Sequence, residues 1–184
     1  YSYSKTFQSD IDIEYYNKIV HTAGLGYTYN ANPKNIKPFR NVKFLRHKAF
    51  ALIRDFNFFY QPKTFSFRTS MDKNYIERLV RNKTGDEIII RPTASRQWNW
   101  MRNYVLKYDL ATSLKFDYAA NVVSLIDEPV GIVQDKQLYK DVVWNSIKQF
   151  GTIRNFNQTA GVNWTIPINK LPFLDWTSAN ARYD

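Results

Sequence analysis

The sequence contains no cysteine, only two histidines and six glycines, and no run of about 18 apolar residues. The absence of cysteine excludes disulfide scaffolds, thiolate zinc sites and cysteine nucleophiles. The two histidines, His21 and His47, lie far apart in the sequence and have no paired carboxylates nearby, so no metal site is predicted. The absence of a long apolar run excludes a transmembrane helix but leaves open spanning strands of roughly 10 alternating residues.

The sequence also lacks the motifs that carry catalysis. It has no glycine-rich phosphate loop, no nucleophile elbow and no Ser/His/Asp set. Asp10, Asp12 and Glu14 lack the glycine and the terminal glutamate of a calcium loop, and they indicate a solvated acidic edge. Asp127 and Glu128 are neighbours, and neighbours on a strand point to opposite faces, which does not suit a glycosidase pair. We therefore predict no enzyme, no catalytic residue, no metal and no cofactor.

Basic and aromatic residues are what the chain has in excess. Lys and Arg number 26 against 16 Asp and Glu, a net charge of +10 that would suit nucleic acid, anionic lipid headgroups or lipopolysaccharide. The 13 Tyr, 13 Phe and 5 Trp suit surfaces that are half apolar and half wet, such as the interface belts of a membrane.

The dominant pattern is alternation of apolar and polar residues with period two, which predicts β-strands with one side-chain set on each face. It covers residues 19–30, 63–80 and 153–167, which are long segments for a soluble protein, where about 5 or 6 residues is usual. The alternation also includes both ends of the sequence, and on that ground we expect the chain to be excised from a larger sheet. We expect about seven or eight antiparallel strands and no internal domain boundary in residues 1–184.

Residues 97–127 predict a hairpin centred on Thr112. Its two apolar faces coincide only if the numbers of paired residues have an even sum, and the centre gives 224. The same register places Lys107 opposite Asp117 and Asp109 opposite Lys115, each pair contributing about 0.2–1 kcal/mol. An even sum predicts a loop of three or five residues, and the absence of glycine favours five.

Connections between the strands differ in length. Residues 128–151 predict a long loop bearing a short helix, and residues 44–56 fit either a helix, which we favour, or the start of a strand. By contrast, the connections at 111–113 and 167–172 are short. Short connections on one side and long ones on the other are typical of outer-membrane barrels.

These patterns predict an all-β fold, in which antiparallel strands form part of the wall of a wide transmembrane β-barrel. One face of the strands is predicted to face lipid, and two tryptophans beyond it, Trp98 and Trp100, to form an aromatic girdle with Arg102 reaching toward headgroups. The other face is too polar for a packed core, which predicts a wide, hydrated lumen. The lipid-facing set is Tyr104, Leu106, Tyr108, Leu110, Phe116, Tyr118, Val162 and Trp164, and the lumen-facing set is Asn103, Lys107, Asp109, Lys115, Asp117 and Asn121.

The run RQWNWMRNYVLKYDLATSLKFDYAANVVSLIDEP, residues 96–129, closely resembles a segment of the SprA/Sov family, the outer-membrane translocon of the type IX secretion system. Three further stretches resemble the same family in the same order: HTAGLGYTYNANP at 21–33, DFNFFYQPKTFSFRTSMDKNYIERLVRN at 55–82 and WTIPINKLPFLDWTSANARY at 164–183. The resemblance covers most of the chain and is least specific at 35–54 and 130–151.

The resemblance implies a very large transmembrane β-barrel made by a single chain, whose wall these antiparallel strands would form in part. It would be a protein-conducting channel in the outer membrane of a Gram-negative bacterium, which exports folded cargo proteins to the cell surface. It implies as partners the rest of the same barrel chain, a PorV-like shuttle protein, a plug protein, cargo with a C-terminal sorting domain, and lipid with lipopolysaccharide. It supplies no catalytic residues.

Two alternatives remain open from the residues alone. The first is a soluble basic β-domain that binds single-stranded nucleic acid, for which Arg96, Trp98, Trp100 and Arg102 would form a stacking platform. The second is a sugar-binding sandwich, in which exposed tryptophans and a carboxylate pair would meet in one groove. Both must explain strands that are longer than a sandwich needs.

Overall fold

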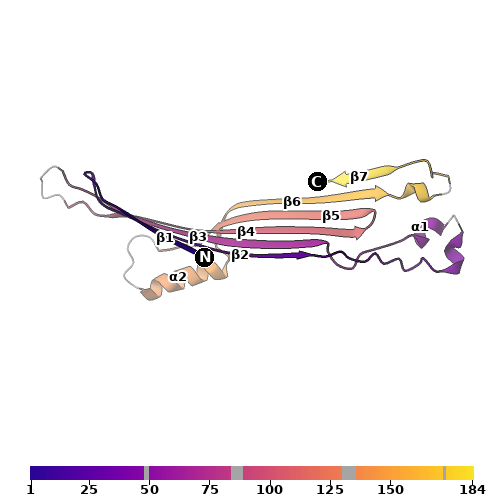
Figure 1. Ribbon diagram of the computed structural model, residues 1–184, viewed down its shortest axis with the longest axis horizontal. Coiled ribbons are helices and arrows are strands. Elements are labelled where there is room, and N and C mark those ends of the chain that lie inside the picture. Colours follow the sequence, from indigo (N-terminus) through magenta and orange to yellow (C-terminus); the bar gives the residue numbers. More distant parts are fainter. Residues whose placement is uncertain (48–49, 84–88, 130–135, 172) are drawn as a thin grey trace. The chain divides into compact units, whose positions relative to one another are not determined.

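The computed structural model describes residues 1–47, 50–83, 89–129, 136–171 and 173–184. Its regular secondary structure is mainly β-strand, with a few short helices (Figure 1). The strands are β1 (Ser2–Gln8), β2 (Ile13–Asn30), β3 (Thr64–Val80), β4 (Thr93–Ala111), β5 (Leu114–Leu125), β6 (Thr152–Ile166) and β7 (Ala179–Tyr183). The helices are η1 (Lys43–Arg46), α1 (Ala51–Arg54), α2 (Lys136–Lys148) and η3 (Ile168–Lys170).

The seven strands form one sheet in the order β1-β2-β3-β4-β5-β6-β7, so each strand pairs with the next in the chain. The pairing is antiparallel, as Ser2 opposite Thr22 and Val162 opposite Tyr183 illustrate. The all-β prediction and the expectation of seven or eight antiparallel strands are thus confirmed. The sheet is open within this chain, because β1 and β7 each have a neighbour on one side alone.

The contacts divide the chain into two compact units. Unit 1 comprises Tyr1–Leu25, Arg68–Arg102 and Asn121–Phe156. Unit 2 comprises Gly26–Phe67, Asn103–Ala120 and Asn157–Asp184. Five strands, β2 to β6, contribute residues to both units. Each unit is described by itself below.

The hairpin of β4 and β5 has the predicted register at the end distant from its turn. There the Ile126 N–H donates to the Trp98 carbonyl at 2.8 Å, and these residue numbers sum to 224. The strand bounds leave only Thr112 and Ser113 between β4 and β5, so the predicted loop of five residues is wrong. A two-residue turn gives an odd sum, so the predicted register holds at the pair Trp98 and Ile126 and does not extend to the turn.

The physical reason for the short turn between β4 and β5 lies outside the hairpin. Two-residue hairpin turns usually need a residue with positive φ, yet Thr112 and Ser113 are not among the described residues with positive φ. Instead Asn57 holds the turn, because its Oδ1 accepts hydrogen bonds from the Thr112 N–H at 2.9 Å and the Thr112 hydroxyl at 3.0 Å. A side chain more than fifty positions away thus replaces the missing glycine.

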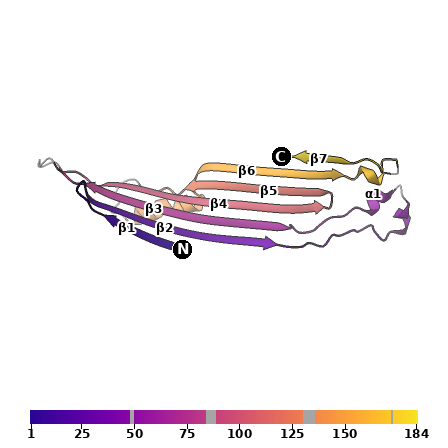
Figure 2. The same ribbon diagram turned by 45° about the horizontal axis from the view of Figure 1, so that its top comes forward.

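The two ambiguous segments are partly helical. Residues 44–56 contain two short helices, η1 and α1, instead of the single amphipathic helix that we favoured. The interval 128–151 contains α2, whose 13 residues lie in unit 1 beside the strands (Figures 1 and 2).

The chain returns from α2 to β6 through Phe150 and Gly151, which have φ of 62° and 72°. This junction needs glycine for two reasons. A left-handed φ is strained for other residues, and a Cβ on Gly151 would lie 2.6 Å from the Leu125 carbonyl oxygen.

Candidate functional site: the two faces of the sheet

The apolar face of unit 2 carries all eight residues predicted to face lipid. Their neighbours on this face are also aromatic: the rings of Phe67 and Tyr104 lie 5.1 Å apart, and the Tyr108 hydroxyl donates to the Phe59 carbonyl at 3.0 Å. All eight residues are half-buried or exposed, with Leu110 at 38% and Trp164 at 44%. The contact of this face with lipid stays a prediction.

The opposite face of unit 2 carries the charged residues. Along β5 exposure alternates, so that Lys115 and Asp117 are exposed while Leu114, Phe116 and Tyr118 are half-buried. The remaining residues of the predicted lumen set also have access to solvent: Asn103 and Lys107 are exposed and Asp109 is half-buried, and Asn121, which belongs to unit 1, is exposed as well. Neither predicted cross-strand charge pair is among the ion pairs of the described residues.

A basic segment, residues 31–63, occupies the end of unit 2 that holds the Thr112 turn. Its backbone is fixed to the strands: the Ala31 N–H donates to the Lys63 carbonyl at 2.9 Å, and Ile36 and Phe58 form a bridge. Asn57 lies at the centre of the junction, 9% exposed, and its Oδ1 also accepts a hydrogen bond from the Asn35 amide at 2.9 Å. The described residues of the segment, 31–47 and 50–63, are therefore a structured part of unit 2.

An ion pair connects the basic segment to the connection after β6. Lys170 of η3 lies 3.1 Å from Asp55, and Arg54 contacts the same carboxylate at 3.3 Å. The hydrogen bond from Lys170 is the main cause that holds the pKa of Asp55 below its ordinary value, with Arg54 acting in the same direction. Three connections of the chain thus meet at this end of unit 2.

A cavity of about 540 Å³ lies among these connections. Its walls are mainly apolar, and they combine residues from the basic segment, the hairpin turn and the end of β6. They include Leu52, Phe56, Leu114, Trp164, Pro167 and Lys170. Thr112 and Asn169 line the same cavity, so the two short connections lie together. The expected placement of short connections on one side and long ones on the other is wrong at this end, because the basic segment, which connects β2 and β3, lies here as well.

In unit 1 the two tryptophans predicted to form an aromatic girdle, Trp98 and Trp100, are half-buried. Trp100 donates to the Thr69 hydroxyl at 2.7 Å, and its ring is stacked 5.8 Å from the ring of Phe150. The Arg102 guanidinium lies over the rings of both Trp100 and Phe150 and is 6% exposed. Arg102 donates to the Ser124 hydroxyl at 2.7 Å and the Phe150 carbonyl at 3.1 Å, so it binds protein and does not reach toward headgroups.

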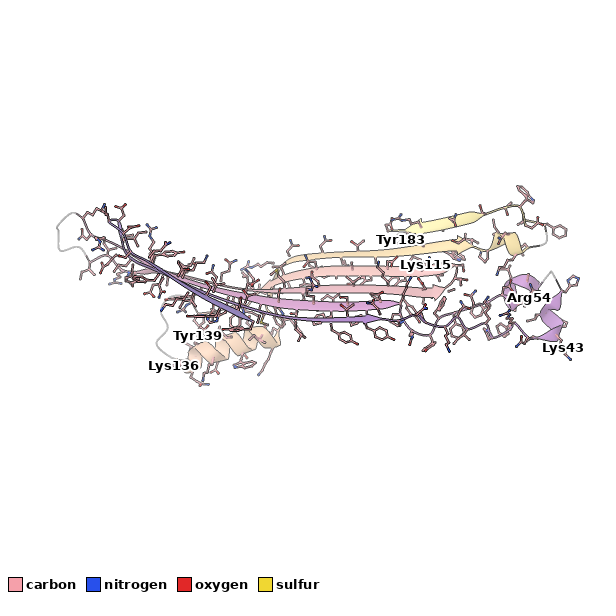
Figure 3. The ribbon with its side chains drawn as sticks, in the orientation of Figure 1. Lys43, Arg54, Lys115, Lys136, Tyr139 and Tyr183 are labelled. Atoms are coloured by element: carbon pink, nitrogen blue, oxygen red, sulfur yellow. The ribbon has the colours of Figure 1, made fainter. Side chains whose placement is uncertain are left out.

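A second polar network fixes α2 to the strands of unit 1. Lys73 of β3 forms an ion pair with Glu128 at 3.0 Å and donates to the Tyr139 hydroxyl at 2.5 Å. Tyr139, on the side of α2 that faces the strands, donates in turn to Glu128, whose carboxylate is 5% exposed (Figure 3). Burial is the main cause that raises the pKa of Tyr139, and the hydrogen bond to Glu128 adds to it.

The network extends to the aromatic residues beside it. The Lys73 ammonium lies 4.5 Å from the centre of the Trp98 ring, and Arg96 lies over the rings of Tyr75 and Tyr139. This network was not predicted, because Lys73, Glu128 and Tyr139 are distant in the sequence and no local pattern indicates that they meet.

Two of the acidic residues considered in the sequence, Asp127 and Asp10, have structural partners. Asp127 accepts a hydrogen bond from Thr152 at 2.8 Å and contacts Ser146 of α2. Asp10 accepts from the backbone N–H groups of Ile13 and Asp12, which lower its pKa in that order. Among the described residues no group of three or more His, Cys, Asp or Glu is arranged to hold a metal.

No helix in the described part of the chain combines the length and apolar character needed to cross a membrane. Comparison with protein-family models gives no match, and no curated protein matches the sequence.

Proposed function

We propose that this chain forms part of the wall of a protein-conducting channel in the outer membrane of a Gram-negative bacterium, the translocon that exports folded cargo proteins in type IX secretion. The resemblance of residues 96–129 to the SprA/Sov family supplies the identity of the channel. A PorV-like shuttle, a plug protein and cargo with a C-terminal sorting domain are the partners that this resemblance implies.

Strand length and order are the observation that carries the proposal. Four consecutive strands, β2 to β5, have 18, 17, 19 and 12 residues, and each pairs with the next in the chain. A strand needs about 9–11 residues to span a bilayer, and strands of soluble proteins usually have about 5 or 6. Antiparallel neighbours in chain order are also the arrangement of outer-membrane barrels.

The two faces of unit 2 support the same proposal. One face is apolar and aromatic, while the other carries Lys107, Lys115 and Asp117 in contact with solvent. In a barrel wall the first face meets lipid and the second meets the water of the lumen. The unpaired edges of β1 and β7 would then pair with further strands of the same barrel, which removes exposed hydrogen-bonding groups.

The alternative of a soluble nucleic-acid or sugar-binding domain has less support. Its stacking platform requires open ring faces on Trp98 and Trp100. Lys73 covers Trp98 on one side, and Phe150 and Arg102 cover Trp100. Such a domain would be soluble without detergent and would bind oligonucleotides with an affinity that falls steeply with salt.

Labelling of introduced cysteines in intact cells tests the membrane orientation. Gln137 on α2 and Thr112 in the hairpin turn are both exposed, and the chain has no native cysteine. We expect a membrane-impermeant maleimide to label Gln137→Cys in intact cells and Thr112→Cys only after permeabilisation. Equal labelling of both positions in intact cells would contradict a spanning strand between them, and the reverse pattern would overturn the orientation.

Export itself is tested by following cargo. In cells that depend on the whole protein, removal of residues 97–127 should abolish the appearance of cargo at the surface and cause it to accumulate in the periplasm. The Thr112→Cys protein, which keeps every strand, is the matched control and should export normally. Normal export by the protein without the hairpin would contradict a role in the channel wall.

A further inference from the structure

The basic segment of unit 2 combines a high positive charge with exposed apolar side chains. Residues 31–63 contain eight Lys and Arg and one acidic residue, Asp55, so they carry +7 of the net charge of +10. Within it Lys34, Lys37, Arg40 and Lys43 are all exposed. Between them stand Ile36, Phe39 and Val42, each about 40% exposed, and Phe44 follows at 76%.

The connection after β6 adds exposed aromatic residues to the same unit. Phe173 is 88% exposed and Trp176 is 82% exposed, values far above those of buried aromatic residues. Large apolar side chains beside Lys and Arg are typical of surfaces that enter the boundary between headgroups and acyl chains. The cationic residues of such a surface are attracted to anionic headgroups.

The cavity described above connects this charged end to the predicted lipid face. Trp164 belongs to the predicted lipid-facing set and lines the cavity together with Leu52 and Phe56 of the basic segment. Lys170 places a cation in the wall of the cavity. Arg54 of α1 contacts the same carboxylate as Lys170, that of Asp55. Figure 3 shows Arg54 on α1 and Lys43 on η1 in this part of unit 2.

We propose that this end of unit 2 binds anionic phospholipid. The basic segment attracts the phosphate headgroup, and the cavity accepts the glycerol and the first part of an acyl chain between Phe56, Trp164 and Leu52. The proposal rests on the membrane location proposed above and specifies which residues hold the leaflet at the ends of these strands. An acidic protein would also be attracted by the charge, but the continuity of the cavity with the apolar face through Trp164 favours lipid.

Photo-crosslinking in vesicles tests the proposal with the whole protein. The photoreactive residue p-benzoyl-phenylalanine replaces Phe56, at the cavity, or Leu106, on the apolar face. The probes are radiolabelled phosphatidylglycerol and radiolabelled phosphatidylcholine. We expect Leu106 to crosslink to both lipids alike and Phe56 to prefer phosphatidylglycerol. Since each basic residue near an anionic surface contributes roughly fivefold to binding, the preference at Phe56 should be on the order of tenfold or more.

Two charge variants distinguish an effect of the basic segment from an effect of the net charge of the protein. The combination K34Q/K37Q/R40Q/K43Q should abolish the preference at Phe56. The matched control R78Q/R81Q/K83Q/R91Q removes four charges from unit 1 and should preserve it. Raising the salt concentration from about 0.05 to 0.5 M should weaken the preference in the unsubstituted protein, because salt screens exposed charges. This last measurement does not depend on the folding of any charge variant.

The outcomes distinguish the inference from the proposed function. Equal crosslinking of the two lipids at Phe56, or a preference that survives K34Q/K37Q/R40Q/K43Q, overturns the lipid site while Leu106 still reports a membrane wall. Crosslinking of Phe56 in cells to a protein instead of lipid also overturns it and identifies an acidic partner. If Leu106 crosslinks to neither lipid, the membrane-wall proposal fails, whatever happens at Phe56.

Discussion

The two units use the same five strands in different ways. In unit 1, α2 and its junction with β6 cover one sheet face, and the charged groups of that face are bonded to protein. In unit 2, the eight residues of the apolar face are half-buried or exposed. β4 is one continuous strand through both units, so strand formation does not distinguish them.

The difference lies in which residues occupy the alternating positions. The even positions of β4 are Ala94, Arg96, Trp98, Trp100 and Arg102 in unit 1 and Tyr104, Leu106, Tyr108 and Leu110 in unit 2. A cation is costly in hydrocarbon unless it is paired, so the first set requires partners or water. The second set contains no charge. Alternation therefore defines the strand, and the chemistry of one face defines what that face can contact.

The largest expected effect comes from a charge on the apolar face of unit 2. Leu106→Arg should cost about 2–4 kcal/mol if this face meets the middle of a bilayer. The amount of heat-modifiable, folded protein in the outer membrane measures the loss. Asn103→Arg, on the opposite face, should assemble normally. Similar assembly of the two variants would show that both faces meet water, and would remove the contrast between the units.

Unit 1 should be most sensitive at the junction between α2 and β6. In Gly151→Ala the new Cβ meets the Leu125 carbonyl oxygen at a left-handed φ, and we expect a cost of roughly 1–3 kcal/mol. Hydrogen exchange should accelerate in α2 and at the start of β6 and remain unchanged in unit 2. Gly24→Ala is the matched control, because its Cβ would have ordinary contacts of 3.6 Å or more. Equal effects of the two variants would contradict a strained junction.

The predictions from the sequence are correct where residues close together in the chain decide the structure. The alternation around Tyr108 and Phe116 predicted the strands, and the matching of their faces predicted the register seen between Trp98 and Ile126. The predictions are wrong where a distant residue decides. Asn57 stabilises a two-residue turn that the local sequence disfavours, and Ser124 with Phe150 binds Arg102, which we had expected to reach toward lipid headgroups. No period or turn rule indicates such contacts.

Alkaline pH should destabilise unit 1. Tyr139 has a raised pKa in the folded protein, so its contribution to stability is complete below its ordinary value of 10.0 and is lost as the pH rises through the folded pKa. Hydrogen exchange of α2, corrected for the intrinsic effect of pH, should therefore accelerate above about pH 10. Tyr139→Phe should remove the pH dependence. A dependence that persists in this variant would assign it to another group.

Acidic pH should destabilise unit 2. The pKa of Asp55 is lowered in the folded protein, so its contribution is complete above the ordinary value of 3.8 and is lost as the pH falls through the folded pKa. Exchange of the basic segment should accelerate in acid, and Asp55→Asn should show the faster rate already at neutral pH. Lys170 and Arg54 form the pair with this carboxylate, so unchanged exchange in acid would contradict their role in holding the segment.

The smallest effect concerns the exposed charges of unit 2. Lys107 and Asp117 face each other in the predicted register, but they are not among the ion pairs of the described residues, whereas Lys73 and Glu128 of unit 1 lie 3.0 Å apart. A double-mutant cycle with Lys107→Gln and Asp117→Asn should give a coupling below about 0.5 kcal/mol, as for most exposed pairs. The cycle with Lys73→Gln and Glu128→Gln should give a larger coupling, because the Glu128 carboxylate is shielded from water. Couplings of equal size would mean that the charge pair of unit 2 is screened by water no more strongly than the shielded pair of unit 1. That result would contradict a hydrated lumen beside β4 and β5.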